Sequence, residues 1–96
     1  MIKKIVKVSA TWCGPCKMFS PIFEEVAKMN EFSGIEFKEY DAEENPEFSE
    51  KYGIRSVPTT IFFDENENEV KRISGAMSKT NFIDLIKQEQ ENIKKD

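Results

Sequence analysis

Hydrophobic and polar residues alternate along the first half of the chain in a pattern that predicts two strands and a helix. Residues 2–10 are rich in β-branched residues and have apolar positions on both faces, which is typical of a strand buried between layers of helices. Residues 13–30 repeat their apolar positions with a period of about 3.6, which predicts a helix. Pro21 lies inside this helix and is expected to kink it. Residues 35–40 alternate and predict a second strand.

The second half of the chain predicts a short helix, a hairpin and a last helix. Asn45-Pro46 starts a helix to about residue 52, and Gly53 follows its end. Residues 59–63 and 69–74 are strands that the polar segment 64–68, rich in Glu and Asn, joins as a solvated turn. Ser78 is the expected N-cap of the last helix, and residues 92–96 are an expected frayed tail. The apolar face of that helix consists of Phe82, Leu85, Ile86 and Ile93.

This order, β-α-β-α-β-β-α, predicts an α/β fold with a mixed sheet that has helices on both faces. At 96 residues, we expect a single domain over residues 1–96. The formal net charge of −4 argues against nucleic acid or an anionic membrane as a partner. The absence of histidine excludes Cys-His catalysis and His-ligated metals. No apolar run is long enough to cross a membrane, and Lys7 interrupts the one that an export signal would need, so we expect a cytoplasmic protein.

Two cysteines carry the candidate chemistry, in the segment Trp12-Cys13-Gly14-Pro15-Cys16-Lys17. They lie where the first strand gives way to the first helix. The start of a helix presents free amide donors and the positive end of the helix dipole, which stabilise a thiolate. A thiolate is the nucleophile in disulfide exchange, so Cys13 is the expected attacking sulfur and Cys16 its partner. We also expect Cys13 to be the exposed cysteine of the pair and Cys16 the sheltered one.

Three other interpretations of the cysteine pair compete with this one. Half of a zinc site would need ligands that this chain lacks, unless a dimer or acidic residues supplied them. A structural disulfide over so short a loop contributes little constraint. Two cysteines buried by chance would explain neither their spacing nor their position. A redox-active pair is favoured over these three.

With these residues in view, the chain resembles the thioredoxin family. The segment from Trp12 to Lys17 matches that family's active-site sequence, and further matches fall in order along residues 2–90. These further matches are Pro21, Asn45-Pro46, Tyr52-Gly53-Ile54-Arg55, Val57-Pro58-Thr59 and Gly75-Ala76.

The resemblance implies a thioredoxin-like fold and the reduction of protein disulfides, without a cofactor beyond the redox-active Cys13–Cys16 disulfide. Protein disulfide substrates and a thioredoxin reductase drawing on NADPH are the implied partners, and a monomer is expected. Pro58 matches the family's cis-proline, although a trans proline opening a strand would be the commoner case for the residue alone. The implied substrate-binding residues are Trp12, Gly14, Pro15, Val57, Pro58, Gly75 and Ala76. For Trp12, packing in the core is an equal alternative.

The chain departs from the family in two ways. Its first strand leads directly into the cysteines, so we expect a short form of the fold, with four strands and three helices and without the family's first strand and helix. Lys7 stands where the family has a buried aspartate, and Glu39 stands where it has a lysine. A buried Lys7–Glu39 pair would restore the charge balance beneath Cys16, with both residues then part of the catalytic site. The alternative is that both side chains reach solvent separately.

The sequence leaves two further functions open. A glutaredoxin-like enzyme would be reduced by glutathione, and a thioredoxin-type binding subunit would work without its cysteines.

Overall fold

The computed structural model describes residues 1–94 and has the predicted order of strands and helices. Its sheet has the strand order β2-β1-β3-β4. The strands are β1 (Ile2–Ser9), β2 (Glu36–Asp41), β3 (Thr59–Asp64) and β4 (Glu69–Ser74). β1 pairs with β2 in parallel and with β3 antiparallel, and β3 and β4 form the predicted hairpin. The prediction of a four-stranded mixed sheet with three helices is confirmed.

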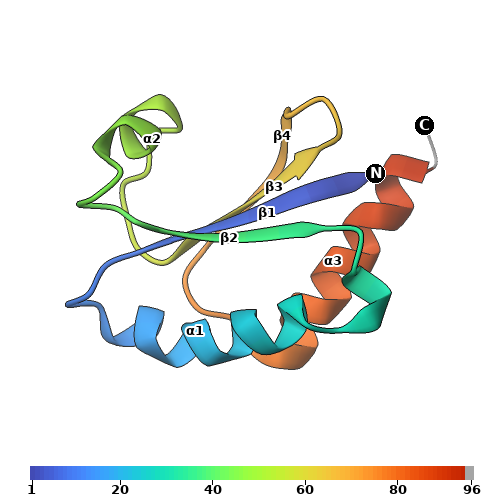
Figure 1. Ribbon diagram of the computed structural model, residues 1–96, viewed down its shortest axis with the longest axis horizontal. Coiled ribbons are helices and arrows are strands. Elements are labelled where there is room, and N and C mark those ends of the chain that lie inside the picture. The colour runs from blue at the N-terminus through green and yellow to red at the C-terminus, as the bar shows by residue number, and fades with distance from the viewer. Residues whose placement is uncertain (95–96) are drawn as a thin grey trace.

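Two helices cover one face of the sheet and the third covers the other (Figure 1). The helices are α1 (Gly14–Ala27), α2 (Pro46–Lys51) and α3 (Lys79–Lys94). α1 and α3 enclose a phenylalanine-rich core in which Phe19, Phe23 and Phe82 are buried. Phe48 of α2 and Tyr52, the residue after it, pack against the apolar residues of the opposite face. None of the helices in this described part is long and apolar enough to cross a membrane.

Several element boundaries differ from the prediction. The helix expected over residues 13–30 begins after Cys13 and ends at Ala27, and the 3₁₀ turn Asn30–Phe32 follows it. Pro21 lies inside α1, which continues through it as one helix, so the expected kink stays a prediction. The expected tail at 92–96 is wrong at its start, because α3 continues to Lys94; residues 95–96 lie outside the described part.

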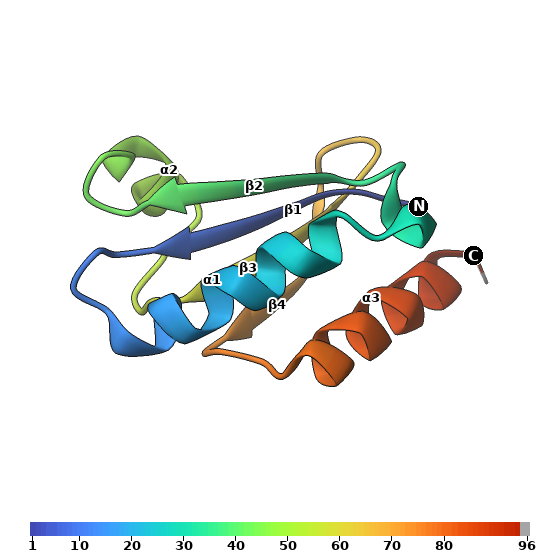
Figure 2. The same ribbon diagram turned by 60° about the horizontal axis from the view of Figure 1, so that its bottom comes forward.

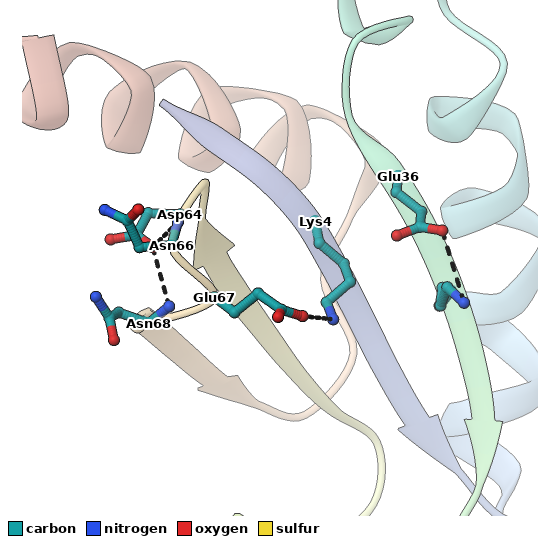
Figure 3. Close-up of polar contacts among 7 residues, drawn as sticks. Lys4, Glu36, Asp64, Asn66, Glu67 and Asn68 are labelled. Atoms are coloured by element: carbon teal, nitrogen blue, oxygen red, sulfur yellow. Dashed lines mark hydrogen bonds and ion pairs between the residues drawn. The ribbon is translucent and has the colours of Figure 1, made fainter.

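Three further local features, one residue after a helix, one helix cap and one hairpin turn, agree with the predictions from the sequence. Gly53 follows α2 with a φ of +61°, which is the left-handed conformation expected of a residue just past a helix. Ser78 Oγ accepts the amide of Asn81 and caps α3. In the β3–β4 turn, the Asp64 carboxylate accepts hydrogen bonds from the backbone amides of Asn66 and Asn68 (Figure 3).

The two ends of the described chain lie close together (Figure 2). The backbone amide of Ile2, at the start of β1, donates a hydrogen bond to the side chain of Gln90 on α3.

Candidate active site

Cys13 and Cys16 are joined by a disulfide at the beginning of α1, and their Cα atoms are 5.3 Å apart. Cys13 is the N-cap of the helix, with an extended backbone, and its Sγ accepts the amide of Cys16 at 3.2 Å. Pro15 occupies the first turn, where a missing amide costs nothing. The beginning of α1, and with it the disulfide, lies at the end of the sheet away from the start of β1 and the end of α3 (Figure 2).

The Val57–Pro58 segment lies against the cysteine pair. The Val57–Pro58 bond is cis, which confirms the prediction for Pro58. The carbonyl oxygen of Val57 is 3.6 Å from Cys13 Sγ, and Val57 packs on Cys13 and Cys16. Gly75, at a φ of +98°, donates its amide to the carbonyl of Pro58 and so ties the loop after β4 to this segment.

Both cysteines are buried, although the helix start was expected to leave Cys13 more exposed. Cys13 is 4% exposed and Cys16 is 2% exposed. The reason is that Val57 and Ala10 pack against the pair. We therefore expect a difference in reactivity between the two sulfurs to arise mainly from their electrostatic surroundings.

Trp12 lies on the surface, not in the core. It is 70% exposed, and its indole N–H donates to Glu43 at 2.9 Å. With Val57, Ile54 and Arg55 it lines a groove of about 350 Å³ beside the disulfide. The interpretation of Trp12 as part of a surface patch therefore holds over that of core packing.

Gly14, the first residue of α1, and Ala76, which follows β4, are both exposed. A Cβ added to Gly14 would meet nothing within 4 Å, so the space there is open. Ala76 lines a second groove of about 270 Å³ with Met18, Ile22 and Met77.

Lys7 and Glu39 form the expected ion pair. They are opposite each other in the register of β1 and β2, and Lys7 Nζ is 3.2 Å from Glu39 Oε1. The Lys7 side chain is 1% exposed and that of Glu39 is 39% exposed, so the ammonium is the deeply buried partner. The alternative, with each side chain solvated separately, is contradicted.

Ser20 belongs to this region, and the sequence did not single it out. Its Oγ accepts a hydrogen bond from Lys7 Nζ and donates one to the carbonyl of Cys16. The helical period places Ser20 on the inner side of α1 next to Phe19, but period alone assigns no role to a half-buried hydroxyl. Among the described residues, no cluster of three or more His, Cys, Asp or Glu could hold a metal ion.

A bonded cysteine pair at the start of a helix, packed against a cis-proline segment, defines the class of proteins that exchange thiols and disulfides. A family model described as thioredoxin matches residues 2–88, and the chain belongs to the thioredoxin family. This confirms the resemblance inferred from the sequence.

Individual relatives agree with this assignment. A thioredoxin of Mycoplasmoides gallisepticum is 42% identical over 85 residues, which cover 88% of this chain and 82% of that protein. A thioredoxin of Aspergillus fumigatus is 42% identical over 72 residues, which cover 75% of this chain and 64% of that protein, just under two thirds. The solved thioredoxin of Malassezia sympodialis superposes with a TM-score of 0.80 at 32% identity, covering 88% of this chain and 72% of that one.

Proposed function

We propose that this chain reduces protein disulfides by thiol–disulfide exchange through the Cys13/Cys16 pair. The observation that supports this most strongly is the position of Cys13 as N-cap of α1, with its sulfur on the Cys16 amide. In the reduced state the same amide and the helix dipole stabilise a thiolate on Cys13. Cys13 is therefore the attacking sulfur and Cys16 the resolving one.

The reaction proceeds in two exchanges. The Cys13 thiolate attacks a substrate disulfide, so that a Cys13–substrate bond forms and one substrate thiolate leaves. The Cys16 thiolate then attacks Cys13 Sγ, which forms the Cys13–Cys16 bond and releases the second substrate thiolate. Two electrons pass from the dithiol to the substrate, and the pair itself carries them, so no resident cofactor is needed.

An extended segment of the substrate binds along the site. The exposed indole of Trp12, the open surface at Gly14 and Pro15, and the Val57 backbone provide this platform. The hydrogen bond from the Gly75 amide to the Pro58 carbonyl fixes the position of the Val57–Pro58 segment. Ala76 extends the platform toward the groove beside Met18.

Lys7 and Glu39 support the resolving step beneath Cys16. The Lys7 ammonium favours a thiolate nearby, and the Glu39 carboxylate compensates the charge of that ammonium in a region that disfavours a lone charge. Glu39 is the candidate proton acceptor in place of the family's aspartate.

A thioredoxin reductase with NADPH regenerates the dithiol in this scheme, and the protein acts as a monomer in the cytoplasm, where thiols are kept reduced. Regeneration is tested by mixing the oxidised protein with thioredoxin reductase and NADPH, and separately with glutathione. NADPH consumption that depends on this protein supports the proposal. Reduction by glutathione alone would point instead to a glutaredoxin-like enzyme.

The order of attack is tested with Cys16→Ser. We expect this variant to accumulate mixed disulfides with protein substrates through Cys13, because the resolving sulfur is gone. Cys13→Ser is the matched control and is expected to trap none. Equal trapping by the two variants, read by mass spectrometry, would overturn the assignment of the two sulfurs.

A further inference from the structure

Ser20 links the buried ion pair to the first turn of α1. Its Oγ accepts from Lys7 Nζ at 2.5 Å and donates to the carbonyl oxygen of Cys16 at 3.0 Å. The Lys7 ammonium thus lies one hydroxyl group away from the backbone of the resolving cysteine. A serine that bonds back to the fourth residue before it is common in helices, but here the same oxygen also accepts from a buried cation.

Without this hydroxyl, the Lys7 ammonium would be expected to lie closer to Glu39 and to solvent. Its remaining polar partner is Glu39, whose side chain is 39% exposed and lies on β2, at an edge of the sheet. A buried ammonium gains by moving toward its partner and toward water. Ser20 opposes this movement, because it offers an acceptor on the α1 side of the sheet.

We propose that Ser20 is a positioning residue for the resolving step, holding the Lys7 ammonium beside the first turn of α1, where its charge favours the thiolate form of Cys16. The inference rests on the proposed thiol–disulfide exchange. In the mixed disulfide, Cys16 must lose its proton before it attacks Cys13 Sγ. The Cys13–Cys16 bond then forms, the Cys13–substrate bond breaks, and the substrate leaves as a thiolate.

The proton has a path to water on the same side. A groove of about 330 Å³ is lined by Cys16 and Ser20 together with Ser9, Thr11 and Asp41. Water in this groove can carry the Cys16 proton to solvent, as a second route beside transfer to Glu39.

Besides Lys7 and Glu39, two charged side chains and one neutral hydroxyl from the neighbouring elements face the surroundings of Cys16 and Lys7. Asp41 lines the groove from β2, and Lys17 lines it from α1 and is exposed. From β3, Thr60 stands opposite Lys7 and does not titrate. Asp41 disfavours the thiolate and Lys17 favours it, but both lie at the open side, where water weakens their effect. The buried Lys7 charge is the one that Ser20 controls.

The test measures the two exchanges separately. Reduced protein is mixed with one equivalent of an aromatic disulfide whose thiolate is coloured. A fast phase reports attack by Cys13, and a second phase of first order reports attack by Cys16. Both are followed across pH for the wild type, Ser20→Ala and Ser20→Thr, with circular dichroism as a check that each variant is folded.

In Ser20→Ala we expect a rise of about 0.5–1 unit in the pH at which the second phase reaches half of its maximal rate. Below that pH, the second phase is then about three- to tenfold slower than in the wild type. The Cys13 phase is expected to be unchanged. Ser20→Thr keeps the hydroxyl and is expected to restore the wild-type profile. In a Lys7→Met background, Ser20→Ala is expected to have no further effect on the pH of half-maximal rate.

Three results would overturn the inference while leaving the function intact. The first is a Ser20→Ala profile that superposes on the wild type, and the second is an equal shift in the Lys7→Met background. A shift in Ser20→Thr as large as in Ser20→Ala would also overturn it, since that would indicate a packing effect. If wild-type protein showed no second phase, the proposed function itself would fail.

Discussion

At the scale of single residues, the two partners of the buried ion pair are not equivalent. The Lys7 side chain is 1% exposed, and it lies among the α1 and β2 side chains with its Nζ 5.7 Å from the centre of the Phe23 ring. Glu39 can turn toward water, because its side chain is 39% exposed. Removing either residue therefore leaves the other in a different environment.

We expect Glu39→Gln to cost about 1–3 kcal/mol in the free energy of unfolding, because it leaves a buried ammonium without a counter-charge. Lys7→Met is expected to be close to neutral, since it replaces the buried charge with an apolar chain of similar length and leaves Glu39 near solvent. Denaturant unfolding of both variants and of the double mutant measures these values. Equal costs that simply add in the double mutant would mean that the two side chains do not interact.

The reactivity of the two sulfurs is a separate prediction at this scale. Cys13 and Cys16 are buried to nearly the same degree, at 4% and 2% exposure. We expect brief alkylation of the reduced protein to label Cys13 first, because the helix start stabilises its thiolate. Mass mapping of the labelled peptides decides this, and preferential labelling of Cys16 would refute it.

The sequence predicted the site unevenly. The cysteine pair could be found from its spacing and position, and Pro58 and the Lys7–Glu39 pair from the resemblance to the thioredoxin family. The burial of Cys13 could not, because it depends on Val57, which is distant in sequence and packs over the sulfur. Ser20 was missed for a similar reason: its two partners lie on different elements.

At the scale of elements, the β3–β4 hairpin is held by local polar contacts. The amide of Asn68 donates to the Asp64 carboxylate and is the main cause that lowers its pKa from 3.8. The Arg72 guanidinium makes two hydrogen bonds to Glu69, at 2.8 and 2.7 Å, and lowers the pKa of that carboxyl from 4.5. A further ion pair joins the turn residue Glu67 to Lys4 on β1 (Figure 3).

The Glu69–Arg72 pair predicts a small acid dependence of stability. Because the folded-state pKa of Glu69 is lowered, the pair stabilises the fold above about pH 4.5 and this contribution is lost as the pH falls through the lowered value. Partial exposure limits it to about 0.5 kcal/mol. We expect Glu69→Gln to lose that amount at about pH 6 and nothing at about pH 3. Glu50→Gln on α2 is the control, and an equal loss at both pH values would contradict the prediction.

The strands and helices themselves were predictable because their periods differ, whereas their ends were less so. The helix expected over 13–30 stops at Ala27, since the next residues form a short 3₁₀ turn that buries Phe32 against the core. No local pattern in the sequence indicates this tertiary contact.

At the scale of the whole molecule, the two faces of the sheet carry unequal cores. On the α1–α3 face, the ring of Phe82 lies 5.3 Å from that of Phe19 and 5.7 Å from that of Phe23. On the other face, α2 contributes only partly buried aromatic residues such as Phe48. The active-site helix α1 is thus anchored in the larger core.

This layering predicts where stability is concentrated. Phe82→Ala is expected to cost about 3–5 kcal/mol in the free energy of unfolding, because it empties a fully buried site among other rings. Phe48→Ala is the matched control and is expected to cost less, because its side chain is only partly buried. Denaturant unfolding monitored by circular dichroism compares them, and a larger cost for Phe48→Ala would contradict this view of the fold.

The central claim, that the Cys13/Cys16 pair carries out thiol–disulfide exchange, is tested most directly by the reduction of insulin disulfides with dithiothreitol as the electron source. Precipitation of the free insulin chain is followed with wild type, Cys13→Ser and no protein. We expect the wild type to accelerate precipitation severalfold over dithiothreitol alone and Cys13→Ser to give no acceleration. A wild-type rate equal to that of dithiothreitol alone, or equal to that of Cys13→Ser, would contradict the account.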